Sequence, residues 1–117
     1  MTLQAYQNTQ RITEDSRTTE YRLFGQVTGA LIDAQKAGRA DAPPLVEAID
    51  WNKKLWRTLA ADCMDDRNQL PQDVRAKIVS LSLWIAKYSR QVTRNGAPLD
   101  PLIEVNRNMM QGLKGAA

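Results

Sequence analysis

Histidine is absent from this chain of 117 residues, and cysteine occurs only once, at Cys63. The absence of histidine removes the commonest general base, the usual partner of a nucleophilic cysteine and the commonest metal ligand. A single cysteine cannot form an internal disulfide, which agrees with a reducing compartment. The sequence also has no glycine-rich phosphate loop and no Gly-x-Ser-x-Gly turn. We therefore expect a protein that is not an enzyme, has no metal or other cofactor and takes no small-molecule substrate.

Long apolar runs are missing as well. The longest, from Leu81 to Ala86, is interrupted by Ser82 and is far shorter than the roughly 20 residues that cross a bilayer. The N-terminus has no basic segment followed by an apolar stretch and a small-residue cleavage site, so we expect no secretory signal. These absences favour a cytoplasmic protein without a membrane partner.

The composition is that of an ordinary globular domain. Hydrophobic residues make up 43% and charged residues 25% of the chain, whose length suits one domain over residues 1–117. The 16 basic and 13 acidic residues are interspersed and leave a net charge of +3, too little to require nucleic acid. A basic cluster at Lys53, Lys54 and Arg57 lies beside two tryptophans, so direct RNA contact is kept as an unlikely alternative.

Proline and glycine divide the chain into about five helical segments, which predict an all-α fold, a single small helical bundle. A short N-terminal helix is predicted over residues 3–12. The next begins at Ser16 as N-cap and ends at Gly38, and later helices are expected from Pro43 to Cys63, from Pro71 to Arg94 and from Asp100 to Gly112. The main bundle would then span residues 16–112, followed by a loose tail over residues 113–117.

The helix from Pro71 to Arg94 is predicted to be the central one. One stripe at helical spacing comprises Val74, Ile78, Leu81, Ile85, Tyr88 and Val92, and the opposite side carries Ala76, Val79, Leu83 and Ala86. A helix that is apolar on two faces is either buried in the middle of a bundle or half covered by a partner. We favour the first interpretation.

The stretch from Ala48 to Cys63 holds two of the three tryptophans. Trp56 and Cys63 lie on a predicted core stripe, so we interpret Cys63 as a small buried hydrophobe. Asn52 lies on the same stripe and needs hydrogen-bond partners, either a loop or helix end of this chain or the backbone of a partner. Trp51 is turned by about 140° from Trp56 on an ideal helix. It is therefore either covered by a second layer, such as the N-terminal segment, or a partly exposed anchor.

Several blocks of sequence, in order along nearly the whole chain, resemble the FlaF family of flagellar biosynthesis regulators. They are YRLFGQVTGAL at 21–31, DWNKKLWRTLAADC at 50–63, LSLWIAKY at 81–88 and PLIEVNRNMMQGL at 101–113. The resemblance implies a cytoplasmic helical chaperone that binds newly made flagellin and promotes its secretion through the flagellar type III apparatus. It also implies a second regulator, FlbT, which restrains flagellin translation, as a possible partner.

The terminal helices of flagellin are apolar and pack only in the filament, so the resemblance suggests that such a segment is held in an apolar groove. We predict that this groove is formed by residues from four of the segments: Leu23, Trp51, Leu55, Val79, Leu83, Met109 and Met110. The rival function is a post-transcriptional regulator of flagellin synthesis that acts on flagellin messenger RNA, directly or through FlbT.

Overall fold

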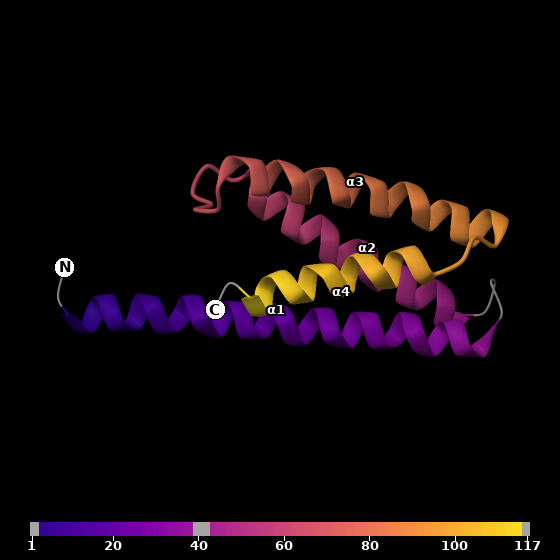
Figure 1. The fold of residues 1–117 in the computed structure, drawn as a ribbon, viewed down its shortest axis with the longest axis horizontal. Helices are drawn as coiled ribbons and strands as arrows, with labels where there is room; N and C mark the ends of the chain where they lie inside the picture. The colour runs from indigo at the N-terminus through magenta and orange to yellow at the C-terminus, as the bar shows by residue number, and fades with distance from the viewer. Residues whose placement is uncertain (1–2, 39–42, 116–117) are drawn as a thin grey trace.

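The computed structural model describes the backbone of residues 3–38 and 43–115, and the side chains of residues 19–38 and 43–113. Within these ranges the chain forms four helices and no strand. They are α1 (Leu3–Ala37), α2 (Pro43–Met64), α3 (Gln72–Asn95) and α4 (Asp100–Gly115), as Figure 1 shows. The all-α prediction is therefore confirmed, with four helices in place of about five.

The first two predicted helices are one continuous helix, α1, of 35 residues. The predicted break between residues 12 and 16, with Ser16 as N-cap, was wrong. Neither glycine nor proline occurs between Leu3 and Phe24, so nothing in this stretch forces the helix to end. Serine favours an N-cap position but is also tolerated inside a helix.

The ends of α3 follow the expected signals, whereas the end of α4 does not. Gly96 adopts the left-handed conformation, with φ of 69°, and its N–H donates to the carbonyl oxygen of Val92 at 3.1 Å. Helix α4 continues past Gly112 to Gly115, so residues 113–115 of the predicted loose tail are helical. Glycine weakens a helix by about 1 kcal/mol without stopping it. Residues 116 and 117 lie outside the described residues.

The packing order places α1 and α2 in the middle of the bundle. Helix α1 packs against both α2 and α4, and α2 packs against both α1 and α3 (Figure 1). Helix α3 has α2 as its main neighbour, so the prediction that the Pro71 to Arg94 helix is central was wrong. One face of α3 is buried at Ile78, Ile85 and Val92, but Leu83 on the other face is 69% exposed. Its second apolar face is therefore covered only in part, because Val79 and Ala86 are half-buried whereas Leu83 is exposed.

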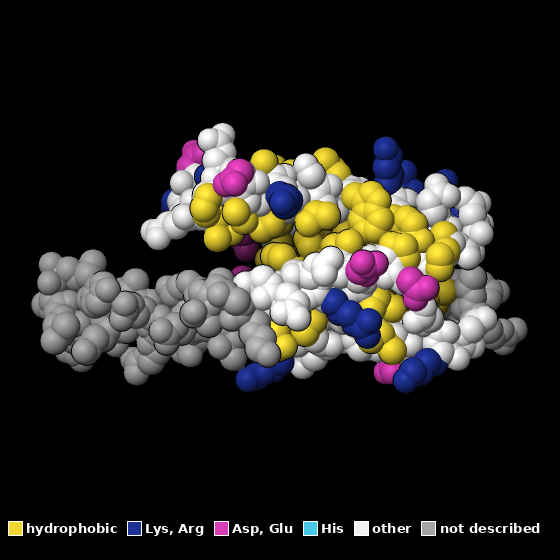
Figure 2. All heavy atoms as spheres, viewed as in Figure 1, with side chains coloured by type: hydrophobic (Ala, Val, Ile, Leu, Met, Phe, Trp, Pro, Cys, Tyr) yellow, Lys and Arg dark blue, Asp and Glu magenta, His cyan; other side chains and the backbone are white. Residues whose placement is uncertain are grey.

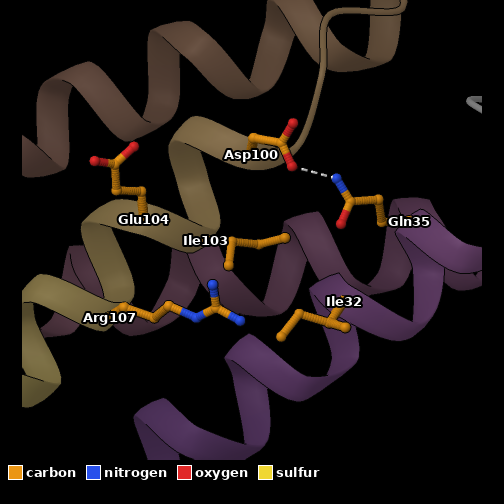
Figure 3. A pocket seen from close by; sticks show the side chains of 6 residues that line it. All are labelled: Ile32, Gln35, Asp100, Ile103, Glu104 and Arg107. Atoms are coloured by element: carbon orange, nitrogen blue, oxygen red, sulfur yellow. Dashed lines mark hydrogen bonds between the residues drawn. The ribbon is translucent and has the colours of Figure 1, made fainter.

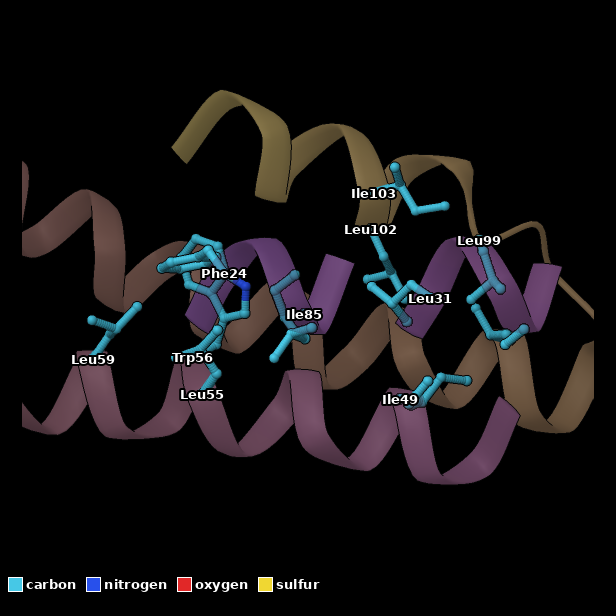
Figure 4. Close-up of a cluster of buried hydrophobic side chains, with 14 of the residues drawn as sticks. Phe24, Leu31, Ile49, Leu55, Trp56, Leu59, Ile85, Leu99, Leu102 and Ile103 are labelled. Atoms are coloured by element: carbon cyan, nitrogen blue, oxygen red, sulfur yellow. The ribbon is translucent and has the colours of Figure 1, made fainter. Parts of the chain in front are cut away.

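The core fills the space between the four helices (Figure 4). Trp56 is fully buried and meets Phe24 of α1 edge to face, with ring centroids 5.5 Å apart. Cys63 is buried as well, which confirms the interpretation of the α2 stripe. Other members of this cluster are Val27, Leu31, Leu45, Ile49, Leu59, Ile85, Leu99, Leu102 and Ile103.

A buried polar network ties α1, α2 and α4 together inside this core. The Nδ2 group of Asn106 donates to Asn52 Oδ1 at 2.8 Å and to Thr28 Oγ1 at 3.2 Å. Asn52 thus pairs with another side chain inside the protein and does not cap a loop or a helix end. Each such bond contributes about 1 kcal/mol net, but an unpaired buried group would cost about 1–3 kcal/mol. The network consequently favours one arrangement of the three helices over others.

Candidate functional site

The largest cavity described lies where α3 and α4 diverge, at the end of the bundle that holds the α2–α3 connection. We call it the α3–α4 groove. Its volume is about 420 Å³. The α3 wall carries Val74, Lys77, Ile78 and Leu81; the rest of the lining is Glu20 of α1, Leu59, Asp62 and Cys63 of α2, Asn68 and Leu70 of the connection, and Met109, Gly112 and Leu113 of α4.

The connection between α2 and α3 closes one end of the groove in a defined conformation. Arg75 donates from Nε to the carbonyl oxygen of Cys63 at 2.7 Å and from Nη2 to that of Asp65 at 3.3 Å. The first bond satisfies a carbonyl that the end of α2 leaves without a helical partner, and the second joins α3 to the connection. Asn68 adds a bond from Nδ2 to the carbonyl oxygen of Asp62, and its Oδ1 accepts from the Leu70 N–H. Leu70 is thereby held at the groove.

The groove is strongly apolar although it opens to solvent. Leu70 is 45% exposed and Val74 is 38% exposed, while Leu81, Met109 and Leu113 are half-buried. Figure 2 shows hydrophobic side chains along the border between α3 and α4, next to the hollow. Trp84 and Tyr88, stacked with centroids 5.1 Å apart, continue the same stripe of α3 beyond the groove. A contiguous exposed apolar surface of this kind marks an interaction site.

Acid–base or thiol chemistry has no support in this site. Burial raises the pKa of the Cys63 thiol, and the nearby Asp62 and Glu20 carboxylates raise it further, against a lowering effect of Arg75. Because the thiolate is the nucleophilic form, a raised pKa works against thiol chemistry here. Within the described ranges no cluster of three or more acidic or cysteine side chains could hold a metal ion.

Two of the residues predicted to bind a partner line cavities. Met109 lines the α3–α4 groove, and Met110 lines a separate hollow of about 240 Å³ beside Tyr21. Of the other five, Leu55 is buried in the core, Leu23 and Val79 are half-buried against it, and Trp51 and Leu83 are exposed. Trp51 is 40% exposed, so the described part of the chain covers it only partly. The binding role of these seven residues stays a prediction.

Three of the groove residues were missed because they lie on a stripe of α3 that the sequence assigns to the core. Val74, Ile78 and Leu81 share that stripe, and only Ile78 is buried. Helix α3 has 24 residues whereas α4 has 16, so α4 is too short to lie beside all of α3. The apolar stripe alone does not indicate which part of α3 stays uncovered. Leu70, an apolar residue directly before Pro71 in a polar connection, is the one signal that could have pointed to the groove.

A smaller cavity of about 290 Å³ lies between α1 and α4 (Figure 3). Its lining is mixed, with Ile32 and Ile103 at its base and Glu104 and Arg107 along α4. Across it, Gln35 Nε2 donates a hydrogen bond to Asp100 Oδ1. This bond joins the last turns of α1 to the first turn of α4, so we assign the cavity a structural role.

Together, the four helices of the described ranges and the groove define a small helical protein with an apolar face open between α3 and α4. A family model described as "Flagellar protein FlaF" matches residues 2–113, nearly the whole chain. The chain belongs to the FlaF family of flagellar proteins, which confirms the resemblance noted in the sequence. No curated protein and no solved structure matches the chain. Over the residues that the structure describes, no helix is both long and apolar enough to span a membrane.

Proposed function

We propose that this protein is a non-enzymatic cytoplasmic carrier that binds flagellin and promotes its secretion through the type III export apparatus. Membership of a flagellar family supports the flagellar role. The observation that supports binding is the α3–α4 groove, whose lining is mainly apolar and open to solvent. We further propose that flagellin presents an amphipathic terminal helix to this groove.

The packing order supports a helix as the occupant. Helices α4, α1, α2 and α3 follow one another as neighbours, and α3 and α4 at the two ends of this series have no extensive contact. A further helix laid along the groove would touch both and bury the apolar side chains that now face solvent. Fully burying one large apolar side chain contributes about 1.5–3 kcal/mol. Three or four such side chains would give useful affinity after the cost of association.

The methionine in the wall suits a carrier that must accept more than one sequence. Met109 lines the groove beside Leu113, and its unbranched side chain can adopt several shapes at low cost. A groove with an adaptable wall tolerates differences among flagellin segments.

Two neutral substitutions in the groove test this proposal, with a matched control elsewhere on the surface. Leu70→Gln and Val74→Gln remove apolar surface without adding charge. Val46→Gln is the control, because Val46 of α2 is 47% exposed and does not line the groove. We expect each groove variant to weaken flagellin binding by about fivefold or more, measured by calorimetry, and the control to bind as the wild type does.

A third variant separates the groove from the surface predicted from the sequence. Leu83→Gln alters the most exposed of the predicted residues, on the opposite side of α3 from Val74. If Leu83→Gln weakens binding and the two groove variants do not, the groove assignment is wrong and the predicted surface is the site. If the wild-type protein shows no binding to flagellin, the proposed function itself is wrong.

A further inference from the structure

The charged residues that line the α3–α4 groove come from different helices according to their sign. Lys77 lies on the α3 wall, whereas Asp62 and Glu20 come from α2 and α1. Both carboxylates raise the pKa of the Cys63 thiol, which places them near the same part of the lining. Asp62 and Lys77 are exposed, and neither forms an ion pair with a described residue. Their charges are thus available to a bound segment.

The partial charges at the helix ends follow the same pattern. The last turns of α2 and α4 contribute Cys63, Gly112 and Leu113 to the lining, and a helix C-terminus carries a partial negative charge of roughly half an electron. The first turns of α3 contribute Val74, at the end of a helix whose partial charge is positive. Arg75 offsets part of the negative charge at α2, because it donates to two carbonyl oxygens there. The groove is therefore positive along α3 and negative where α1 and the ends of α2 and α4 line it.

An amphipathic helix has a left and a right flank beside its apolar face, and the two flanks exchange sides when the helix is turned end for end. A groove whose positive and negative groups come from different lining helices therefore distinguishes the two directions. We propose that the α3–α4 groove binds its partner helix in one direction only, with a basic flank toward Asp62 and an acidic flank toward Lys77. This inference rests on the proposed flagellin-binding function and adds the direction and charge pattern of the bound helix.

Charge reversals test it with full-length protein and monomeric flagellin as the probe. Asp62→Lys and Lys77→Glu each replace an attraction by a repulsion, and we expect each to weaken binding by about fivefold. The double variant keeps the net charge but inverts the pattern, so it should accept the same helix turned end for end and bind more tightly than either single variant. At about 1 M salt, where the screening length falls to about 3 Å, the differences among the variants should shrink.

The matched control reverses two exposed charges on α1 that do not line the groove. Asp33→Lys with Lys36→Glu changes the same residue types and also keeps the net charge, so it should bind flagellin as the wild type does. Circular dichroism and melting temperature confirm that each variant is folded. A double groove variant that binds no better than the single variants would overturn the inference, as would single variants that bind as the wild type does. Tighter binding by Lys77→Glu would also overturn it, because only net charge would then matter. These results leave the proposed function unaffected. If the wild-type protein does not bind flagellin, both the inference and the proposed function are wrong.

Discussion

The indole Nε1 of Trp56 donates a hydrogen bond to Oδ1 of Asn106 at 2.9 Å, with both side chains fully buried. This bond joins α2 to α4, two helices that have no extensive contact among the described residues. Since Asn106 also donates to Thr28 and Asn52, one amide connects three helices. The polar centre of the core therefore fixes where α4 lies along the bundle.

Removing this amide should destabilise the protein strongly. Asn106→Ala leaves Trp56 Nε1 and Asn52 Oδ1 buried without their partner, and we expect the free energy of unfolding to fall by about 3 kcal/mol. Urea denaturation followed by circular dichroism measures the free energy of unfolding. Asn108→Ala is the control, because Asn108 lies two residues further along the same helix and is exposed. Equal losses in the two variants would contradict the structural role of the network.

The two tryptophans of α2 should differ sharply in their effect on stability. Trp56→Ala removes a fully buried ring and its hydrogen bond, so we expect a loss of about 4 kcal/mol. Trp51→Ala removes a ring that is 40% exposed, and we expect a loss of about 1 kcal/mol or less with an unchanged circular dichroism spectrum. Chemical denaturation of the two variants side by side makes the comparison. A large loss for Trp51→Ala would show that the ring is covered by a second layer.

The buried thiol should make stability fall at high pH. Because the pKa of Cys63 is raised in the folded protein, the unfolded chain loses this proton first as the pH rises. The contribution of the protonated thiol is thus complete below the ordinary thiol pKa of about 8.5 and is lost above it. We expect Cys63→Ala to be less stable by about 1 kcal/mol at pH 7, and the difference from wild type to narrow between pH 8 and pH 10. A constant difference across that range would contradict the raised pKa.

Salt dependence distinguishes flagellin binding from the rival RNA function. Direct RNA binding releases counterions and should weaken steeply as salt increases, whereas an apolar helix in a groove should keep most of its affinity. A pull-down of flagellin by the purified protein, at low and high salt and with or without RNase, makes this comparison. Loss of flagellin after RNase treatment would favour the RNA-dependent alternative.

Much of the fold could be predicted from local signals along the chain. Gly96 ended α3 as expected, and the spacing of Ile49, Trp56 and Cys63 identified the buried face of α2. The break before Ser16 was wrong because a capping residue is only a preference, and no glycine or proline enforces it. Asn52 was recognised as buried, but its partner Asn106 is 54 residues away. A single sequence shows no link between positions so far apart.

The groove was harder to predict than the core because the residues of both lie on apolar stripes at helical spacing. A stripe at helical spacing is equally apolar whether a neighbouring helix covers it or not, and Val74 and Ile78 differ only in what lies above them. The sequence therefore indicated that α3 has more apolar surface than a simple bundle needs, but not which part stays open. It pointed to Leu83 and Trp51, which lie outside the largest described cavity, but also to Met109, which lines that cavity.

The lack of an extensive contact between α3 and α4 also bears on how a cargo would be released. A segment enclosed on all sides must be threaded out, or its container must unfold. A helix bound in the α3–α4 groove, which is open to solvent, could instead dissociate one turn at a time without unfolding of the protein that holds it. Handover to an export gate would then require only that the gate compete for the exposed end of the segment.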